Sequence, residues 1–558
     1  MVTSREGVLL IIGFLALFTH AWFRKNEPKS LLRLLAFWTA VVLPSSYALL
    51  LHVGSSFQAF TLASTSFTTT LLLSISLYRL SPLHPLSRYP GPWQCKLTKL
   101  WGAYIAWGGK PYVYYKRLHD QYGPVVRIGP NELSVVDADL IPNVLGASGM
   151  PKGPMWSGRR ILPSKNWNRN NSLTSVRDLR RHAELRKPWN TAFKPSSIAE
   201  YEGMLIARAE QMIRCLKAFC TRDGPSAIDL ALWINFFTFD FMGDLAFGGV
   251  YSLMRDGDTQ QVLLKMKRGV FMPSISQHIP WILGTLHAIS FVSADTRAFG
   301  MFGIEQAKKR AAMQDNLTRK DLFYHLLEDA KMPVLTKLVS SALLAIVAGS
   351  DTTSSALANI CYYLIRYPDY LHRLREELDA TFKPSEPNET IEINALASLP
   401  LLDAIINETL RLQPPIPTSL QRAPADGSGG KALSPDMYIL EGTAVQISPW
   451  VIHRCPRYFY PDPDKFWPDR WISGDPSIIL DKSAFIPFST GPANCPGRPL
   501  AIIELRYVTC LLVRTFDMSF EPDYDVAQWE ESLEDRFVML KGELPVKLAL
   551  REVGKKSD

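Results

Sequence analysis

Residues 488–501 read Phe-Ser-Thr-Gly-Pro-Ala-Asn-Cys-Pro-Gly-Arg-Pro-Leu-Ala, and this stretch is suited to holding the thiol of Cys495 in a fixed position. Gly491 and Gly497 permit backbone angles that a side chain would forbid, so the chain can loop closely around a flat ligand. Proline is tolerated in the first turn of a helix, and the apolar run that follows predicts a helix starting just after Pro496. The positive end of that helix would favour the thiolate over the thiol.

A thiolate held in this way is a suitable axial ligand for an iron porphyrin. The alternative is a buried cysteine that only packs. The pattern Phe488-x-x-Gly491-x-x-x-Cys495-x-Gly497 resembles the haem-binding loop of the cytochrome P450 family. The resemblance implies haem b (iron protoporphyrin IX) as the cofactor and Cys495 as the axial iron ligand. It departs at Ala493, where the family usually has a basic residue that contacts a haem propionate.

Composition excludes several other classes of protein. The chain has 558 residues, 47% apolar and 20% charged, which is ordinary globular material. Its seven cysteines are scattered without a Cys-x-x-Cys pair, which argues against a disulfide framework or a structural zinc site. The net charge of +8 is spread along the chain, and no basic stripe interleaved with aromatics indicates a nucleic-acid partner. A mildly basic surface suits an anionic membrane or an acidic redox partner.

Residues 1–80 predict a membrane anchor with up to three spans, at about 8–23, 34–53 and 57–78. Each stretch is close to the length needed to cross a bilayer. Basic residues gather between the first two stretches and after the third, so the positive-inside rule places the N-terminus in the lumen and the remainder in the cytosol. The alternative is one anchor followed by two interfacial or packed helices.

The rest of the chain predicts a mainly α fold with small β-sheets. The Pro- and Gly-rich segment 81–93 predicts a stiff, extended connector, followed by one catalytic domain over 94–558. Two short strands are expected at 125–128 and 133–136, with a turn between them. Apolar residues at helical spacing dominate 176–380, and short strands are expected within 413–475. The resemblance implies the cytochrome P450 fold over about 85–550.

The stretch Ala348-Gly349-Ser350-Asp351-Thr352-Thr353 lies in an apolar helical segment. A glycine inside a helix costs about 1 kcal/mol relative to alanine, and a buried carboxylate needs a partner. A helix kink or a tertiary hydrogen bond would explain both. Beside the cysteine loop, the resemblance implies that Gly349 opens a groove for dioxygen and that Thr352 donates a hydrogen bond there. It also implies that Asp351 relays protons inward as a general acid.

Glu408 and Arg411 lie three residues apart on a predicted helix and therefore share a face. Their apolar neighbours predict that the pair is buried, and a buried ion pair needs further partners. The alternative is an exposed helix pair. Arg470, in a Phe-Trp-Pro-Asp-Arg-Trp stretch, resembles the third member of a structural triad in the family. The expected role is to support the scaffold behind the cysteine loop rather than to act in catalysis.

Three cationic or polar side chains are expected to bind the haem propionates. His182 and Arg186 lie four residues apart and can point the same way from one helix. The family presents Trp-x-x-x-Arg at this place, so His182 is a departure in residue type. Arg422 follows a proline-rich segment where the family often places another propionate-binding cation. A solvated charged helix face and a surface arginine are the corresponding alternatives.

These observations together predict a membrane-bound haem-thiolate monooxygenase of fungal type, acting with O2 on a lipophilic metabolite such as a terpenoid. No Gly-x-Gly-x-x-Gly unit indicates a flavin or nicotinamide site, so electrons are expected from NADPH through a separate flavoprotein reductase. The predicted location is the endoplasmic reticulum membrane with a cytosolic catalytic domain. Loops at 156–167 and 271–279 are expected to select the substrate.

Two other functions remain consistent with parts of the sequence. A haem-thiolate isomerase or dehydratase would not need the proton relay at Asp351 and Thr352. A haem-binding sensor or a multispan carrier is the non-enzymatic alternative, although a carrier would need polar residues within its spans. Four sequons, at Asn170, Asn316, Asn388 and Asn407, are expected to be unglycosylated because the predicted topology places them in the cytosol.

Overall fold

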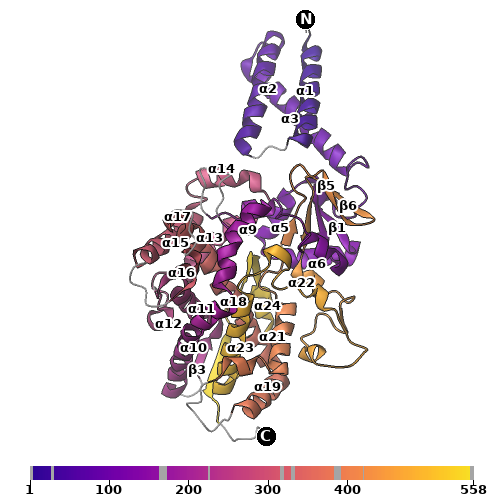
Figure 1. Cartoon of the computed structure of the whole chain (residues 1–558). Coiled ribbons are helices and arrows are strands. Elements are labelled where there is room, and N and C mark those ends of the chain that lie inside the picture. The colour runs from indigo at the N-terminus through magenta and orange to yellow at the C-terminus, as the bar shows by residue number, and fades with distance from the viewer. Residues whose placement is uncertain are drawn as a thin grey trace.

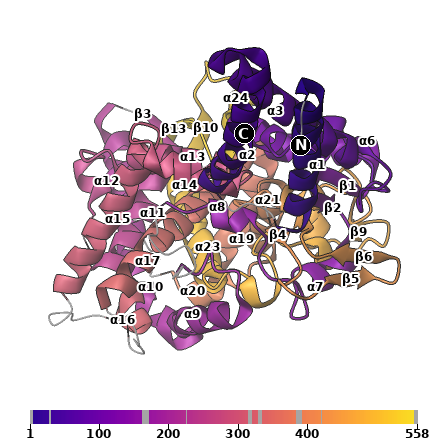
Figure 2. The same cartoon turned by 90° about the horizontal axis from the view of Figure 1, so that it is seen from above.

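The computed structural model describes residues 4–26, 30–161, 172–223, 226–249, 251–313, 320–327, 334–382, 391–418 and 420–552. A bundle of three helices projects from a larger, mainly helical body (Figure 1). Seen from above, α10, α12 and α15 lie on one side of this body, and β1, β2, β5 and β6 lie on the other (Figure 2).

The bundle consists of α1 (Arg5–Lys25), α2 (Leu31–Val53) and α3 (Ser56–Leu80). All three are long and apolar enough to cross a membrane. They pack through a shared apolar seam that includes Ile12, Val42 and Phe67. The Trp38 indole also donates a hydrogen bond of 3.1 Å to the Thr68 hydroxyl, joining α2 to α3. A fourth helix, α11 (Leu230–Phe247), is equally apolar, but 78% of it is buried inside the body, so it is a core helix.

The connector between bundle and body folds differently from the sequence prediction. Instead of an extended strand, residues 81–90 form consecutive turns closed by backbone hydrogen bonds such as Ser87 N–H to His84 O, 2.8 Å. His84 and Leu86 are buried. The buried Arg127 guanidinium donates to the Arg79 carbonyl at 3.1 Å, tying the end of α3 to the body. Prolines favour turns as well as extended chain, and tertiary contacts select the turns here.

The body is built mainly from helices, as predicted. Their bounds are α4 (Trp93–Leu97), α5 (Leu100–Trp107), α6 (Pro111–Tyr122), α7 (Ile141–Val144), α8 (Met155–Gly158), α9 (Leu179–Ala192), α10 (Pro195–Asp223), α12 (Leu253–Asp256), α13 (Val262–Ser276), α14 (Leu283–Ala288), α15 (Ala294–Ala312), α16 (Leu322–Leu327), α17 (Val334–Ile346), α18 (Thr352–Arg366), α19 (Pro368–Thr381), α20 (Ile393–Leu396), α21 (Pro400–Leu412), α22 (Pro449–Ile452), α23 (Arg498–Thr515) and α24 (Ala527–Ser532).

The strands form small sheets at the edges of the helical core. Their bounds are β1 (Val125–Gly129), β2 (Glu132–Val135), β3 (Ser226–Asp229), β4 (Leu420–Arg422), β5 (Gly430–Ser434), β6 (Met437–Leu440), β7 (Ala444–Ile447), β8 (Phe459–Tyr460), β9 (Ile479–Leu480), β10 (Phe516–Phe520), β11 (Glu534–Arg536), β12 (Val538–Leu540) and β13 (Pro545–Leu550). The largest sheet has the order β1-β2-β7-β4. Its β1–β2 hairpin matches the two strands expected near residues 125 and 133, with Val126 opposite Ser134.

The central helices place the site. α18 packs against α11, α21 and α23, and all four lie in the main hydrophobic core. α18 continues α17 through a π-helical segment, η4, at Val347–Asp351. Single π-helical turns inside a longer helix often occur at functional sites because they widen the helix and redirect side chains. The mainly α fold with small sheets is therefore confirmed, and the interruption falls on the Ala-Gly-Ser-Asp stretch singled out from sequence.

Candidate active site

A large cavity inside the body brings the predicted site residues together. Its volume is about 810 Å³, within the usual range for small-molecule and cofactor sites. Cys495, Gly349 and Thr352 all line it, although they come from widely separated parts of the chain. Phe488, Gly497, His182 and Arg186 line it as well.

The cysteine loop is closed by a backbone hydrogen bond of 2.9 Å from Cys495 N–H to the Phe488 carbonyl. Gly491 has a positive φ of 70°, and a Cβ there would lie 2.2 Å from the Leu145 carbonyl oxygen, so glycine is required. Gly497 differs from the prediction, since its φ of −80° is accessible to any residue. Its Cβ position is 4.0 Å from the Cys495 sulfur, so glycine here keeps the side of the thiol open.

The α23 helix begins at Arg498, close to the predicted start. The electrostatics of the Cys495 thiol are more balanced than the helix dipole alone suggested. Burial raises the pKa of Cys495, whereas hydrogen bonding from the Gly497 and Arg498 backbones and the charge of Arg186 lower it. Arg186 also donates a hydrogen bond of 2.7 Å to the Asn494 side chain, next to the cysteine. Arg186 therefore holds the loop that carries Cys495.

The η4 segment forms the opposite part of the lining. A Cβ on Gly349 would lie 2.4 Å from the Met242 sulfur of α11, so glycine permits close helix packing as well as cavity space. The Thr352 hydroxyl donates to the Ala348 carbonyl at 2.7 Å, inside the widened turn. Asp351 is buried, and burial raises its pKa to about 6 despite the opposing charge of Lys541. A carboxyl group with this pKa exchanges protons near neutral pH.

Two polar side chains near this segment were missed by the sequence analysis. Glu504 of α23 lines the cavity, and burial raises its pKa well above the usual range, with a hydrogen bond from Thr353 acting in the opposite direction. Lys541, just after β12, donates to the Ser354 hydroxyl at 2.7 Å and to the Asn235 amide oxygen at 2.8 Å. Glu504 lies nine positions after Cys495 in the sequence, and no local pattern separates it from an ordinary helix glutamate.

The predicted structural triad is assembled and fully buried. Arg411 contacts both Glu408 oxygens at 2.8 Å, and the Arg470 Nε donates to Glu408 at 3.0 Å. All three side chains are 0% exposed. Burial raises the pKa of Glu408, but the charges and hydrogen bonds of Arg411 and Arg470 outweigh it and leave the pKa below the usual range. Glu408 is thus an ionised carboxylate at the centre of a buried network.

His453 connects this triad to the cysteine loop. Its Nδ1 lies 3.2 Å from the Arg411 carbonyl, and its Nε2 accepts a 2.9 Å hydrogen bond from Ile486 N–H. The pKa of His453 is lowered well below its usual value by burial and by the charge of Arg411. The neutral ring therefore donates from Nδ1 and accepts at Nε2. A rigid path leads from α21 to the segment preceding Phe488.

Buried cations gather beside the cavity. Lys152 lines it and donates to the Leu173 and Thr174 carbonyls at 2.7 and 3.0 Å. Arg422 pairs with Lys152 through a β-bridge and lies behind the Trp156 ring rather than in the cavity lining. His182 is buried, and its pKa is lowered to about 4 by burial and by the charges of Lys152, Arg186 and Arg422. His182 is therefore neutral at physiological pH. The sequence analysis missed Lys152, whose role depends on this pairing.

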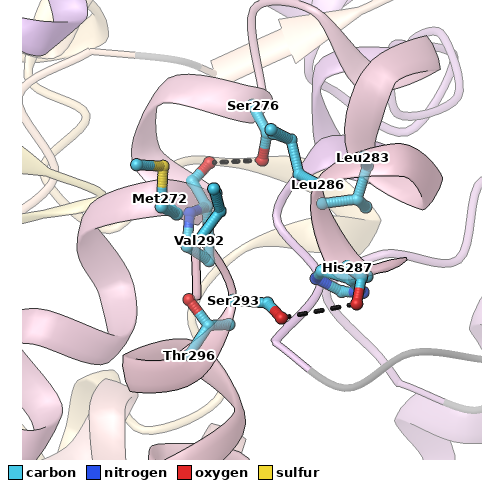
Figure 3. Close-up of a pocket in the computed structure, with 9 residues that line it drawn as sticks. Met272, Ser276, Leu283, Leu286, His287, Val292, Ser293 and Thr296 are labelled. Atoms are coloured by element: carbon cyan, nitrogen blue, oxygen red, sulfur yellow. Dashed lines mark hydrogen bonds between the residues drawn. The ribbon is translucent and has the colours of Figure 1, made fainter. Parts of the chain in front are cut away.

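A second hollow between α13, α14 and α15 is far smaller. Ser276, His287 and Thr296 are among the residues that line it, and its volume is about 10 Å³ (Figure 3). That is enough for about one water molecule. The Ser276 hydroxyl donates to the Pro273 carbonyl and the Ser293 hydroxyl to the His287 carbonyl, so the hydroxyls shown there are already used (Figure 3). This hollow is not a candidate substrate site.

Comparison with known proteins identifies the chain's family. A model of the cytochrome P450 family matches residues 88–548. The chain belongs to the cytochrome P450 family. It is 31% identical to tryprostatin B 6-hydroxylase of Aspergillus fumigatus, over 86% of this chain and 83% of that protein. It is also 31% identical to cytochrome P450 67 of Uromyces fabae, over 93% of this chain and 95% of that protein. Cytochrome P450 monooxygenase notG' of Aspergillus versicolor is 31% identical over 86% and 85%, respectively.

Membership of the family makes the chain a cytochrome P450 monooxygenase with a haem-iron cofactor. The residues present fit this group. The Cys495 sulfur opens onto a cavity with largely apolar walls. At its edge, Lys152 and Arg422 are 7% and 2% exposed, and within the described part of the chain neither forms an ion pair with a carboxylate. Buried cations are paired in stable proteins, and the haem propionates supply the missing anions.

Proposed function

We propose that the chain oxidises a lipophilic fungal secondary metabolite at the cavity lined by Cys495 and Thr352. The overall reaction inserts one oxygen atom of O2 into the substrate and reduces the other to water, consuming two electrons and two protons. The observation that carries the proposal is the presence of an accessible thiol and a Thr-Asp pair on one largely apolar cavity. Tryprostatin B 6-hydroxylase, by its name, acts on a metabolite of this kind.

In this proposal Cys495 is the axial ligand, and the haem iron, once bound, supplies the activation of dioxygen. The Phe488 carbonyl and the Gly497 backbone hold the sulfur in place. Lys152 and Arg422 provide charge for the propionates, and neutral His182 provides a hydrogen-bond donor. Arg186 contributes positive charge while positioning Asn494 beside the ligand. This set compensates for the neutral Ala493.

Proton delivery is assigned to Asp351, Thr352 and Glu504. Asp351 holds a proton for part of the time near neutral pH because burial raises its pKa to about 6. The Thr352 hydroxyl lies in the cavity lining and exchanges its Ala348 partner for an acceptor in the cavity. Glu504 is a second buried carboxyl on the same cavity, and it keeps its proton at neutral pH. These groups supply the protons that the reduction of oxygen requires.

The ligand assignment is tested by Cys495→Ala. This variant is expected to lose the red-shifted carbon monoxide band of thiolate-bound ferrous haem, because the other cysteines do not line the cavity in the described residues. Cys510→Ala is the matched control, since Cys510 is buried in the same helix that follows the loop. A retained band in Cys495→Ala would reject the proposal.

Monooxygenation is tested by Thr352→Ala together with a screen of lipophilic metabolites for a mass gain of one oxygen atom. The variant is expected to keep consuming NADPH while releasing peroxide in place of product. Serine at this position retains the hydroxyl, so Thr352→Ser is the matched control and is expected to keep most of the coupling. Equal coupling in wild type and Thr352→Ala would favour an isomerase or dehydratase.

We infer that α1–α3 anchor the enzyme in the endoplasmic reticulum membrane and that an NADPH-dependent flavoprotein reductase meets the body in the cytosol. Three spans and the charge distribution support this order. Exposed apolar residues continue from the bundle onto the body at Trp93, Tyr104 and Trp107, and α14 contacts α2, which suits a body resting on the bilayer. A lipid-dissolved substrate would then enter from the membrane side.

A glycosylation experiment tests this topology. A sequon placed in a lengthened loop at 54–55 should be modified in microsomes, because this connector faces the lumen. Protease added outside should digest the body. Of the native sequons, Asn407 is half-buried on α21, whereas Asn170, Asn316 and Asn388 lie outside the described residues. All four should remain unmodified, and glycans on them or a protected body would reverse the topology.

A further inference from the structure

Arg159 stands out among the residues that line the cavity because no role in the proposed chemistry requires it. It follows α8 and lies on the substrate side, next to Trp156. Burial lowers its pKa to about 10, with Asp535 opposing and Arg422 adding to this effect, so the guanidinium remains charged at neutral pH. A desolvated cation on an otherwise largely apolar wall needs a reason.

The backbone that carries Arg159 is fixed by the end of α13. A Cβ on Gly158 would lie 2.5 Å from both Gln277 Cα and the Ser276 carbonyl oxygen, so the two segments touch directly. The Ser276 hydroxyl donates to the Gly158 carbonyl at 2.9 Å. The two loops expected to select the substrate therefore meet here. Trp167, the far end of the first loop, lies outside the described residues.

The Arg159 side chain is positioned as firmly as its backbone. Its Nε donates to the Gln277 amide oxygen at 2.7 Å, and Gln277 is itself held by a 2.8 Å bond to the Ser274 carbonyl. The guanidinium carbon lies 4.2 Å from the centre of the Trp156 ring and 5.0 Å from that of Phe537. These rings pack on the guanidinium, while its N–H groups point outward in its plane.

The charges on the cavity wall are unbalanced. Among the described residues that line it, Lys152, Arg159, Arg160 and Arg186 are cationic, and Glu504 is the acidic one. Burial raises the pKa of Glu504 well above its usual range, so it contributes no charge near neutral pH. The two haem propionates lie where Lys152, Arg186 and Arg422 gather. Positive charge on the substrate side is left without an anion.

We propose that Arg159 is a substrate-binding residue that takes a carbonyl-type oxygen of the substrate, as in a carboxylate or an amide. The substrate class is then an apolar molecule with such an oxygen at one end, and the bond to Arg159 directs the rest of the molecule toward Thr352. This inference rests on the proposed function, because it assigns the cavity to the substrate. The planar N–H fork of arginine suits such oxygens and gains strength in a dry pocket.

Binding of a matched set of probes tests the proposal: 6-phenylhexanoic acid, 6-phenylhexanamide and hexylbenzene. They share one skeleton and differ in the terminal group. Affinity for the detergent-solubilised, haem-loaded full chain is measured by equilibrium dialysis and by the Soret spin-state shift. Wild type should bind the acid or the amide at least tenfold more tightly than the hydrocarbon, and the ratio of acid to amide distinguishes a carboxylate substrate from a neutral one.

Arg159→Gln should remove this preference and leave hexylbenzene affinity within twofold. The matched control is Arg214→Gln, because Arg214 is an exposed arginine of α10 paired with Glu210 at 3.6 Å. Gln277→Leu removes the acceptor that orients Arg159 and should reduce the preference partially. An intact carbon monoxide band in every variant shows that the haem site is preserved. Equal affinities for the three probes in wild type, or an unchanged preference in Arg159→Gln, would overturn the inference. Loss of the band in wild type would instead reject the proposed function.

Discussion

Replacing Glu408 by glutamine should destabilise the body strongly while preserving the size of the side chain. Glu408 accepts five hydrogen bonds, from Arg411 twice, Arg470, the Trp471 indole and Trp467 N–H, at 2.8 to 3.0 Å. Glutamine offers one oxygen and turns the other position into a donor that faces donors. The two arginines would then be buried without an anion. Removing one partner of a buried ion pair costs about 3–5 kcal/mol.

Asp403→Asn is a matched control on the same helix. Asp403 is bound by Arg506 through two hydrogen bonds of 2.7 Å, the same geometry as Glu408 with Arg411. The Asp403 and Arg506 side chains are 33% and 19% exposed, however, so water screens the pair. Its loss should cost no more than about 1 kcal/mol. The contrast between the two variants isolates burial as the cause, because helix, charge change and geometry are shared.

The assay is urea unfolding of the haem-loaded enzyme in detergent, followed by tryptophan fluorescence and by the thiolate-haem absorbance. Glu408→Gln should unfold at a clearly lower urea concentration than Asp403→Asn. The absorbance should also be lost before the fluorescence changes, because His453 links Arg411 to the segment that precedes the cysteine loop. Equal midpoints for the two variants would refute the argument that burial of Glu408 makes the network structural.

Two further predictions concern the η4 segment. Lys541→Met should raise the pKa of Asp351 above about 6, because the Lys541 charge lowers it; if protonated Asp351 supports turnover, the fall in rate with rising pH should move to higher pH, and an unshifted pH–rate profile would contradict this. Gly349→Ala should lower stability by about 1–3 kcal/mol, because the new Cβ would lie 2.4 Å from the Met242 sulfur; adding Met242→Ala should recover part of the loss in thermal unfolding, and no recovery would place the strain elsewhere.

The sequence alone determined the family, the mainly α fold and most of the site. The cysteine loop, the Asp351-Thr352 pair and the Glu408–Arg411 spacing are local patterns in which a few neighbouring residues carry the information. Burial of the Glu408 pair could also be predicted, because its neighbours on the helix are apolar. The structure places these motifs on one cavity or in one buried network, as expected from their chemistry.

Only the tertiary structure decided the features that depend on distant segments. Lys152 meets Arg422 across a β-bridge, Lys541 reaches Ser354 near Asp351, and Arg159 bonds to Gln277 from another loop. The prolines of the connector favour turns and extended chain alike, and burial of His84 and Leu86 selected the turns. A charge or a pKa in a protein depends on how far the group is removed from water and on which charges surround it. Both quantities arise from the packing of segments that the linear sequence keeps far apart.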